Sequence, residues 1–518
     1  MPAPITPDAI GQERVFEFLK GLATDSPVHR IDTHAASVFL AGTRALKVKR
    51  AVRFAFLDYS TLAKRKAACE AELNVNQPFA PQIYRRVVPI TQGEDGSLNI
   101  DGDGAAIEYA VEMSRFDERQ TLDHLAQSGP IEAALVEGIA DAIAASHARA
   151  AAAPTEPWIQ SIPSLIEGNT TALRAAASRR RQTVDELDEA SRSAFSGVRH
   201  LLTQRGQKGF VRHCHGDLHL GNIVVIERQP VLFDAIEFDP AIASTDVLYD
   251  LAFPMMDFLH YQHRAAANVL LNRYLTMTSD ENLAAIAALP LFMSMRAAVR
   301  AKVLYDRLAQ TSGEDAAVAE AARAYLDLAR QLIIPPAPNL VAVGGLSGTG
   351  KTVLARALAP ALEPLPGAVV QRSDIARKHR FQVDETDRLP PDAYQPEVTR
   401  QVYEDLARRA DQLLRQGHSV IVDAVFARQS ERTEISDVAR TRHVPFVGLF
   451  LVADLSTRMN RVGQRQEDAS DATPEVAKFQ EGYDVGAVDW ARIDASGTPE
   501  QTLQNGKAAL GRRQPDPG

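Results

Sequence analysis

The sequence predicts a multidomain chain of mixed α/β and α+β class, with a two-lobed N-terminal part followed by a C-terminal parallel sheet. Three observations support this prediction. First, 518 residues are too many for one hydrophobic core. Second, the proline-rich segment at 333–338 stops any helix and favours extended backbone, so its two sides should fold separately. Third, short strands and long helical segments precede it, whereas strands and helices alternate after it.

In the N-terminal part, short apolar strands at 37–40 and 45–48 flank a Gly42-Thr43 turn, which predicts a hairpin. Helical periodicity then dominates the chain up to the proline-rich segment. A small β-rich lobe followed by a mostly helical lobe is therefore expected. The predicted helical segments are 131–150, 171–204 and 280–330, and further strands are predicted at 210–212, 223–226 and 231–233.

After the proline-rich segment, apolar strands near 340, 368, 419 and 446 alternate with helical stretches, which predicts a parallel sheet. The expected domain limits follow from this pattern. They are residues 1–332 and 339–505, with a linker at 333–338 and a flexible tail at 506–518.

Composition limits the class of protein. Hydrophobic residues make up 45% and charged residues 24%, the balance of an ordinary globular protein. The formal net charge of -9 argues against nucleic acid or an acidic membrane as partner, whereas a small anionic substrate needs only a local basic site. Cys69 and Cys214 cannot build a disulfide framework, and no signal peptide or membrane span is recognisable. We therefore expect a cytoplasmic protein, and the oligomeric state is not readable from the sequence.

A first candidate centre lies in the N-terminal part, in the stretch from His215 to Asn222 (HGDLHLGN). Phosphoryl transfer requires a carboxylate near the acceptor hydroxyl, metal ligands and a cation on the phosphates. Asp217 and Asn222 have the spacing of a catalytic carboxylate and a metal-binding amide, and Asp234 follows an apolar strand, where a second metal ligand belongs. A capping or turn role for a single Asp is the alternative, but the ordered set favours chemistry. His215 more often braces such a loop than reacts.

These residues make the first 330 positions resemble the aminoglycoside phosphotransferase and choline kinase group, small-molecule kinases with a bilobal protein-kinase-like fold. The resemblance implies that Lys47 contacts the ATP phosphates and that Glu72 is its ion-pair partner, with Lys49 and Glu70 as competing choices. It also implies an interlobe hinge at 108–113. Further matching segments are Thr33-His34, Val38-Phe39-Leu40, Ala45-Leu46-Lys47, Phe56-Leu57-Asp58 and Tyr249-Asp250-Leu251-Ala252.

Two other features of this part bear on activity. No glycine-rich loop precedes Lys47, so the turn at 33–37 would cover the phosphates, and Asp250 is expected to brace the catalytic loop. Three arginines share one predicted helix face and could meet an anionic substrate, although arginines extending from an apolar helix are the more common case. They are Arg296, Arg300 and Arg307.

A second candidate centre is a complete Walker A loop between a strand and a helix. Its glycines let backbone N–H groups surround phosphates, Lys351 reaches the β and γ phosphates, and the Thr352 hydroxyl binds magnesium. The predicted nucleotide-binding residues are Gly345, Leu346, Ser347, Gly348, Thr349, Gly350, Lys351 and Thr352.

Residues after the Walker loop complete this centre. Asp423 ends an apolar strand and is a plausible metal ligand. Asp374 and Arg377 resemble the pair that activates and binds the acceptor in polynucleotide kinase, although a helix N-cap is the alternative for this segment. Arg461 and Arg465, together with Arg458, resemble the lid arginines of gluconate kinase, shikimate kinase and zeta toxin kinases, with an exposed basic face as the alternative. Sequences with this loop often carry the label AAA family ATPase.

The sequence therefore predicts a bifunctional, ATP- and Mg2+-dependent phosphotransferase acting on small hydroxyl-bearing molecules. Two alternatives remain open. In one, only the P-loop domain is catalytic, on a nucleotide or a nucleic-acid end, and the N-terminal domain recognises the acceptor. In the other, the chain is a non-catalytic nucleotide-sensing module in which ATP changes the angle between the domains. The acceptor itself cannot be named from the sequence.

Overall fold

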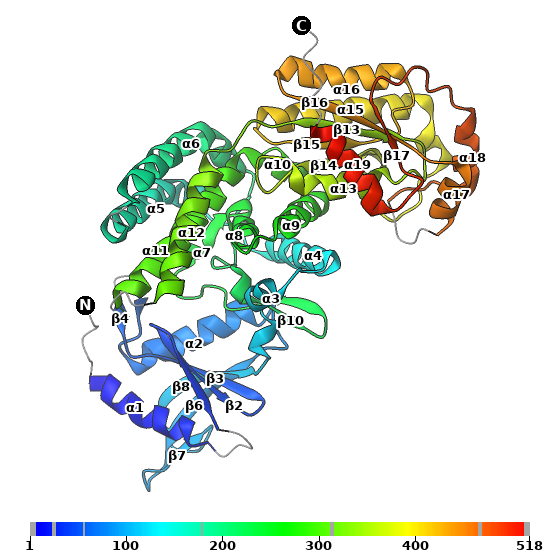
Figure 1. Cartoon of the computed structure of the whole chain (residues 1–518). Helices are drawn as coiled ribbons and strands as arrows, with labels where there is room; N and C mark the ends of the chain where they lie inside the picture. Colours follow the sequence, from blue (N-terminus) through cyan, green and yellow to red (C-terminus); the bar gives the residue numbers. More distant parts are fainter. Residues whose placement is uncertain are drawn as a thin grey trace. The chain divides into compact units, whose positions relative to one another are not determined.

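The computed structural model describes residues 7–22, 27–54, 57–177, 180–310, 315–464 and 469–511. Phe56, Arg465 and residues 512–518, all named in the sequence analysis, lie outside these ranges. The chain forms two compact units (Figure 1). One comprises Met1–His263 and Met295–Leu326, and the other comprises Arg264–Ser294 and Asp327–Gly518.

A six-stranded antiparallel sheet forms the first lobe of the first unit, in the order β1-β2-β3-β8-β6-β7. The predicted hairpin is confirmed as β2 and β3, and its turn contains Gly42 with a φ of 59°. The strands are β1 (His29–Asp32), β2 (Ala36–Ala41), β3 (Arg44–Lys49), β6 (Tyr84–Gln92), β7 (Leu98–Ile100) and β8 (Ala105–Ser114), with a separate pair of β4 (Arg53–Phe54) and β5 (Leu57–Asp58).

The alternation of side chains along β3 positions the candidate lysines. Leu46 and Val48 are fully buried in a core that also holds residues of α1 (Pro7–Lys20). Because successive strand residues point to opposite faces, Lys47 and Lys49 lie on the other face. Helix α2 (Leu62–Asn76) covers that face and brings Glu72 to the two lysines.

A mostly helical lobe follows, as predicted. The loop with Asp217 lies between β9 (Val211–His213) and the hairpin of β10 (Ile223–Ile226) and β11 (Gln229–Leu232). Within the described residues, no helix has the length and apolar content needed to cross a membrane. The helices are α3 (Leu122–Ser128), α4 (Ala133–Arg149), α5 (Thr155–Ala176), α6 (Arg181–Gln207), α7 (Pro240–Ala243) and α8 (Val247–His260), and a short strand β12 (Ser244–Asp246) pairs with β9. Two further helices, α11 (Leu289–Gln310) and α12 (Ala316–Ile333), contribute residues to both units.

The second unit contains a five-stranded sheet in the order β14-β15-β13-β16-β17, with every neighbouring pair parallel. The predicted parallel α/β sheet is therefore confirmed, and β17 is a strand that the sequence analysis did not predict. The strands are β13 (Leu340–Gly345), β14 (Val369–Arg372), β15 (Val420–Asp423), β16 (Phe446–Val452) and β17 (Ala491–Asp494). The helices are α13 (Lys351–Leu358), α14 (Ser373–Phe381), α15 (Pro396–Arg415), α16 (Gln429–Arg442), α17 (Leu455–Gly463), α18 (Pro474–Phe479) and α19 (Pro499–Gly511).

Helices α9 (Arg264–Met277) and α10 (Asp280–Leu283) group with this sheet although they precede the proline-rich segment. Arg264 Nη1 lies 2.7 Å from Glu363 Oε1, and Asn268 Nδ2 donates to the Ala368 carbonyl at 3.0 Å. The bounds of the two compact units differ from the predicted domain limits of 1–332 and 339–505. Separate folding of those two segments therefore stays a prediction.

The end of the chain differs from the predicted flexible tail. Residues 506–511 form the last part of α19. They are helical because Leu503, Ala509 and Leu510 pack against the core of the sheet, and Gly506 lies against Leu354 of α13.

His418 carries a pH-dependent part of the stability of the second unit. Its ring is fully buried, and its Nε2 lies 3.1 Å from the Ile286 carbonyl. Burial lowers the pKa of His418 to about 4. In the unfolded chain the pKa of histidine is about 6.5, so the unfolded state binds more protons as the pH falls. The free energy of unfolding should therefore fall by about 3 kcal/mol between pH 7 and pH 4.

This prediction can be checked by urea unfolding at pH 7 and at pH 4.5, followed by the fluorescence of Trp490 in a Trp158→Phe background. His418→Gln should reduce the difference between the two pH values, because glutamine does not titrate. His443→Asn, which replaces an exposed histidine of the same unit, is the matched control. An unchanged pH dependence in His418→Gln would contradict the prediction.

Candidate active sites

Lys47 lies at the centre of a charge cluster in the first unit, in which Glu72 is fully buried and Asp234 is partly exposed. Its Nζ lies 2.8 Å from Glu72 Oε1 and 2.5 Å from Asp234 Oδ1. Asp234 follows β11 with a φ of 62°, a backbone conformation that only a few non-glycine residues adopt. Its N–H donates to the Tyr84 hydroxyl at 3.1 Å, which helps to hold this conformation. The structure thus brings together three residues that are 25 and 187 positions apart in sequence.

The charges of this cluster stabilise one another. Burial alone would lower the pKa of Lys47, but the Asp234 and Glu72 carboxylates hold it well above its usual value. Burial raises the pKa of Asp234, but the Lys47 ammonium outweighs this effect and brings it to about 2. Burial also raises the pKa of Glu72, but the ammonium groups of Lys47 and Lys49 outweigh this effect and lower it. All three groups are therefore charged at neutral pH.

Lys49, the competing lysine, belongs to the same cluster. Its Nζ lies 2.6 Å from Glu72 Oε2 and contacts the Glu237 carboxylate, which also accepts a bond from the Tyr59 hydroxyl at 3.2 Å. The competing carboxylate Glu70 is exposed and lies 3.8 Å from Lys66 instead. Sequence analysis missed Glu237, although its position three residues after Asp234 was a usable signal.

Asp217 stands on the loop between β9 and β10, with its side chain 45% exposed. The Asn222 side-chain nitrogen donates to the Asp217 carbonyl at 2.9 Å and lies 3.5 Å from Asp217 Oδ2. His219 Nε2 is 3.6 Å from the same carboxylate. The chain between Asp217 and Asn222 ends in a short 3-10 helix, Leu220–Asn222, which brings the Asn222 side chain back toward Asp217.

Buried side chains support the Asp217 loop. Gly216 has a φ of 83°, and its N–H donates to Asp250 Oδ1 at 2.9 Å, which agrees with the bracing role expected for Asp250. The Arg296 guanidinium donates to the Gly216 carbonyl at 3.0 Å and lies 3.9 Å from the Tyr249 ring centroid. His215 Nε2 lies 2.8 Å from the Phe233 carbonyl, and burial lowers the pKa of His215. His215 therefore connects the Asp217 loop to the strand that precedes Asp234.

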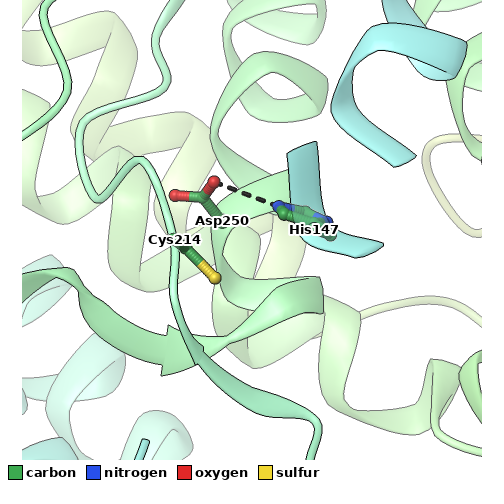
Figure 2. A group of neighbouring side chains, drawn as sticks. All are labelled: His147, Cys214 and Asp250. Atoms are coloured by element: carbon green, nitrogen blue, oxygen red, sulfur yellow. Dashed lines mark hydrogen bonds and ion pairs between the residues drawn. The ribbon is translucent and has the colours of Figure 1, made fainter. Parts of the chain in front are cut away.

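Asp250 also belongs to a cluster of possible metal ligands with His147 and Cys214 (Figure 2), whose ligand atoms lie within 4.8 Å of one another. His147 Nε2 is 3.2 Å from Asp250 Oδ2. Burial raises the pKa of Cys214 well above its usual value, so without a bound metal this side chain is a neutral thiol. Arg296 lies 3.8 Å from the same carboxylate and already balances its charge. We therefore interpret the group of His147, Cys214 and Asp250 as structural support for the Asp217 loop.

The expected hinge at 108–113 is wrong. These residues lie inside the ten-residue strand β8, paired with β3 on one side and β6 on the other. Glu108 is buried and accepts bonds from Arg65 Nε at 2.9 Å and Gln12 Nε2 at 2.8 Å. The connection to the helical lobe can begin only after Ser114, where β8 ends.

In the second unit, the Walker loop joins β13 to α13. Gly345, Gly348 and Gly350 have φ values of 138°, 86° and 91°. A Cβ on Gly348 would lie 2.5 Å from the Arg458 carbonyl oxygen, so the position accepts glycine alone. Lys351 Nζ lies 3.3 Å from the Leu346 carbonyl, and Thr349 Oγ1 donates to the same carbonyl at 2.8 Å. The predicted strand, loop and helix are thus all present.

Thr352 and Asp423 meet at the end of this loop. The Thr352 hydroxyl donates to Asp423 Oδ2 at 2.6 Å, and Arg372 Nε is 3.7 Å from the same oxygen. Asp374 begins α14 just after β14. Burial and the Asp423 carboxylate raise the pKa of Asp374, while the charges of Arg372 and Lys351 oppose them. These three charged neighbours indicate that Asp374 lies beside the Walker loop. Sequence analysis missed Arg372, the residue two positions before it.

Arg377 lies on the same helix as Asp374. Its Nη1 donates to the Ala393 carbonyl at 2.5 Å, and its guanidinium lies 4.9 Å from the Tyr394 ring centroid. Tyr394 in turn donates to Asp471 Oδ2 at 2.6 Å, and Lys378 Nζ lies 3.2 Å from Asp471 Oδ1. Arg377 was predicted from the sequence, but its neighbours Tyr394, Lys378 and Asp471 were not, because the group comes from three separate segments of the chain.

The arginines of α17 point to different partners. Arg461 donates to the carbonyls of Ala495 and Gly497 at 2.7 and 2.8 Å, and its Nη1 is the nearest atom, at 4.0 Å, to a Cβ placed on Gly350. Arg458 is buried and donates to the Ala477 carbonyl at 2.7 Å. Arg461 thus lies next to the Walker loop and holds the segment after β17, and the prediction for Arg465 lies outside the described residues.

Comparison with protein families assigns each part of the chain. Residues 34–286 match the model described as phosphotransferase enzyme family, and residues 340–482 match a model described as AAA domain. The N-terminal part of the chain is therefore similar to phosphotransferases, and the C-terminal part is similar to AAA domains. The two matches confirm the resemblances drawn from the sequence and support an enzyme of the kinase or phosphotransferase class.

Similarity also extends to whole-chain relatives and to solved structures that match parts of the chain. An uncharacterised protein of Mycobacterium tuberculosis strain H37Rv is 29% identical over 494 residues, which cover 93% of this chain and 95% of that protein. A choline/ethanolamine kinase family protein from Mesorhizobium loti is 14% identical and covers 63% of this chain and 95% of that chain, with a TM-score of 0.38. A gluconokinase from Sinorhizobium meliloti 1021 is 20% identical and covers 34% of this chain and 93% of that chain, with a TM-score of 0.25.

Proposed function

We propose that the chain is an ATP- and Mg2+-dependent phosphotransferase with two active centres, each of which transfers the γ-phosphoryl group to a hydroxyl of a small molecule. One observation carries this proposal. Each unit gathers its own lysine, its own oxygen ligands suited to a hard cation, and a further carboxylate: Lys47, Asp234 and Asp217 in one, and Lys351, Asp423 and Asp374 in the other.

In the first centre, the exposed Asp217 carboxylate is free to approach an acceptor hydroxyl and to accept its proton. Lys47, held by Glu72, supplies positive charge for the ATP phosphates. As the P–O bond to ADP breaks and the bond to the acceptor oxygen forms, the hydroxyl proton passes to Asp217 and then to solvent. Because Gly216 and Leu220 are anchored by Asp250 and Asp257, the Asp217 loop needs no rearrangement to act.

In the second centre, the positive-φ glycines of the Walker loop leave room for phosphate oxygens close to the backbone. Lys351 supplies charge to the β and γ phosphates. Asp374 is a carboxylate of raised pKa beside this loop and is the group placed to accept the acceptor proton. Arg377, on the same helix one turn later, would orient the acceptor.

The ligand sets in both centres fit Mg2+. Thr352 Oγ1 and Asp423 Oδ2 are hard oxygen donors only 2.6 Å apart, and Asp234 and Asn222 offer a carboxylate and an amide oxygen. When bound, Mg2+ neutralises phosphate charge. Thr352 and Asp423 would hold the ion of the second centre, and Asp234 and Asn222 that of the first. Arg372 lies next to Asp423 and offsets part of its negative charge, which disfavours a second ion there.

The proposal is tested by incubating the full-length chain with ATP, Mg2+ and a broad extract of small metabolites, and by searching for phosphorylated products by mass spectrometry. Wild type should form at least one product, and the double variant Asp217→Asn/Lys351→Ala should form none. Tight ATP binding with no product in wild type would instead support the nucleotide-sensing alternative. A product formed only on nucleotides or nucleic-acid ends, and insensitive to Asp217→Asn, would support the single-centre alternative.

A further inference from the structure

Arg300, on α11, lies in a polar cluster of the first unit that adjoins the Asp217 loop. Leu220, three residues after Asp217, donates its N–H to Asp257 Oδ2 at 3.1 Å. The other oxygen of Asp257 accepts a bond from the Tyr325 hydroxyl at 2.9 Å. The Arg300 guanidinium lies 5.6 Å from the Tyr325 ring centroid. A continuous chain of contacts therefore runs from the Asp217 loop through Asp257 and Tyr325 to Arg300.

The hydrogen bonds of this cluster leave the charge of Arg300 without a direct ionic partner. Asp257 already has both oxygens bonded, to Leu220 and Tyr325. Arg300 bonds the Tyr325 hydroxyl, which is neutral, and its buried Nε has no hydrogen-bond partner among the described residues.

The other two arginines that share the predicted helix face behave differently. Arg296 is buried, and its guanidinium is used by the carbonyls of Gly216 and Tyr249. Arg307 is exposed at the surface. Of the three, Arg300 alone combines partial exposure with contact to the Asp257–Tyr325 pair that adjoins the Asp217 loop.

Aromatic and histidine side chains border Arg300 and could bound a ligand. The rings of His260 and Tyr325 are stacked with centroids 3.6 Å apart, and Tyr261 lies 5.1 Å from His260. His219, which is 3.6 Å from the Asp217 carboxylate, packs edge-on against Phe253. His260, Tyr261 and Arg300 are all partly exposed, so a ligand can reach this border.

We propose that Arg300 forms an anion-binding subsite next to Asp217, and that the acceptor of the first centre is a hydroxyl compound that also carries a carboxylate or phosphate group. This inference rests on the proposed function. The Asp217 carboxylate would take the acceptor hydroxyl while the Arg300 fork bonds the anionic oxygens, as guanidinium groups do with carboxylates and phosphates.

The electrostatics of the site agree with this assignment. Burial opposes the charge of Arg300, but Asp257, Tyr325 and Asp217 raise its pKa, so the guanidinium stays charged. The contribution of Asp217 agrees with the chain of contacts that connects its loop to Arg300. A charge-assisted hydrogen bond in a partly desolvated site contributes enough to change affinity by about 10- to 100-fold.

The test uses the full-length Lys351→Ala chain, in which transfer at the second centre is strongly lowered, with paired acceptors of which one member carries a carboxylate or phosphate group and the other does not. Suitable pairs are glycerate and glycerol, homoserine and homoserinol, and glycerol 3-phosphate and glycerol. We expect kcat/KM to favour the anionic member of at least one pair by about 10- to 100-fold. The pair that shows the preference distinguishes a carboxylate from a phosphate. Arg300→Met should abolish the preference and leave the KM for ATP within about twofold, as expected for a residue remote from the nucleotide.

Arg307→Met, on the same helix but exposed, should leave the preference unchanged, and Arg300→Lys should restore part of it. Asp217-dependent transfer that favours neutral or cationic acceptors would overturn the inference and leave the proposed function standing, even if Arg300→Met failed to fold. An equal loss with charged and neutral acceptors in a folded Arg300→Met would overturn it as well. No Asp217-dependent transfer to any acceptor would overturn the proposed function itself, and the inference with it.

Discussion

Asp217→Asn should lower phosphoryl transfer at the first centre by about 10²- to 10⁴-fold, the usual contribution of a positioned general base. Asparagine has the same shape as aspartate, so only the negative charge and the proton acceptor are lost. The loop itself should not move. It is held through the Gly216 and Leu220 N–H groups and through the Asn222 bond to the backbone carbonyl of residue 217, none of which involves the Asp217 carboxylate.

The measurement is the rate of product formation in the Lys351→Ala background, so that only the first centre contributes. Asp306→Asn, which replaces an exposed aspartate of α11, is the control and should keep the parent rate. The KM for ATP should stay nearly constant in Asp217→Asn because the nucleotide is expected to contact Lys47 and Asp234. A rate above half of the parent value would exclude Asp217 as the general base.

In the first unit, the local part of the site could be predicted from sequence and the long-range part could not. Asp217 and Asn222 are close along the chain, so their spacing already fixes their relation. Lys47 and Lys49 posed a harder choice, because the period of two along β3 places both on the face covered by α2. Only the structure shows that both lysines contact Glu72. It also shows that they differ in their second partner, which is Asp234 for Lys47 and Glu237 for Lys49.

The bond between Asp257 and Tyr325 spans 68 residues, and no local pattern signals it. Helical spacing correctly placed Arg296, Arg300 and Arg307 on one helix, but spacing gives no information about what lies opposite each side chain. The same limit applies in the second unit, where Arg458 and Arg461 share α17 and bond different segments. The Walker loop was predictable in full because strand, loop and helix are contiguous in sequence.

Lys351→Ala should lower transfer at the second centre by about 10²- to 10³-fold, the usual cost of removing one charged group that stabilises the transferring phosphoryl. The Walker backbone should keep its conformation. The positive φ values of Gly345, Gly348 and Gly350 and the Thr352 contact with Asp423 do not depend on the lysine side chain. The bond that is lost, from Lys351 Nζ to the Leu346 carbonyl, is long at 3.3 Å.

Product formation in the Asp217→Asn background isolates this effect, since only the second centre is then active. Arg356→Ala, at an exposed position one turn and a half along the same helix, is the matched control and should keep the parent rate. The KM for ATP should rise together with the fall in kcat, because Lys351 meets phosphates in both the bound and the transition state. If Lys351→Ala keeps the parent rate, the second centre does not use its Walker lysine and is not a kinase of this type. If instead each single variant abolishes all product, the two centres act in sequence on one metabolite, and the product of one is the acceptor of the other.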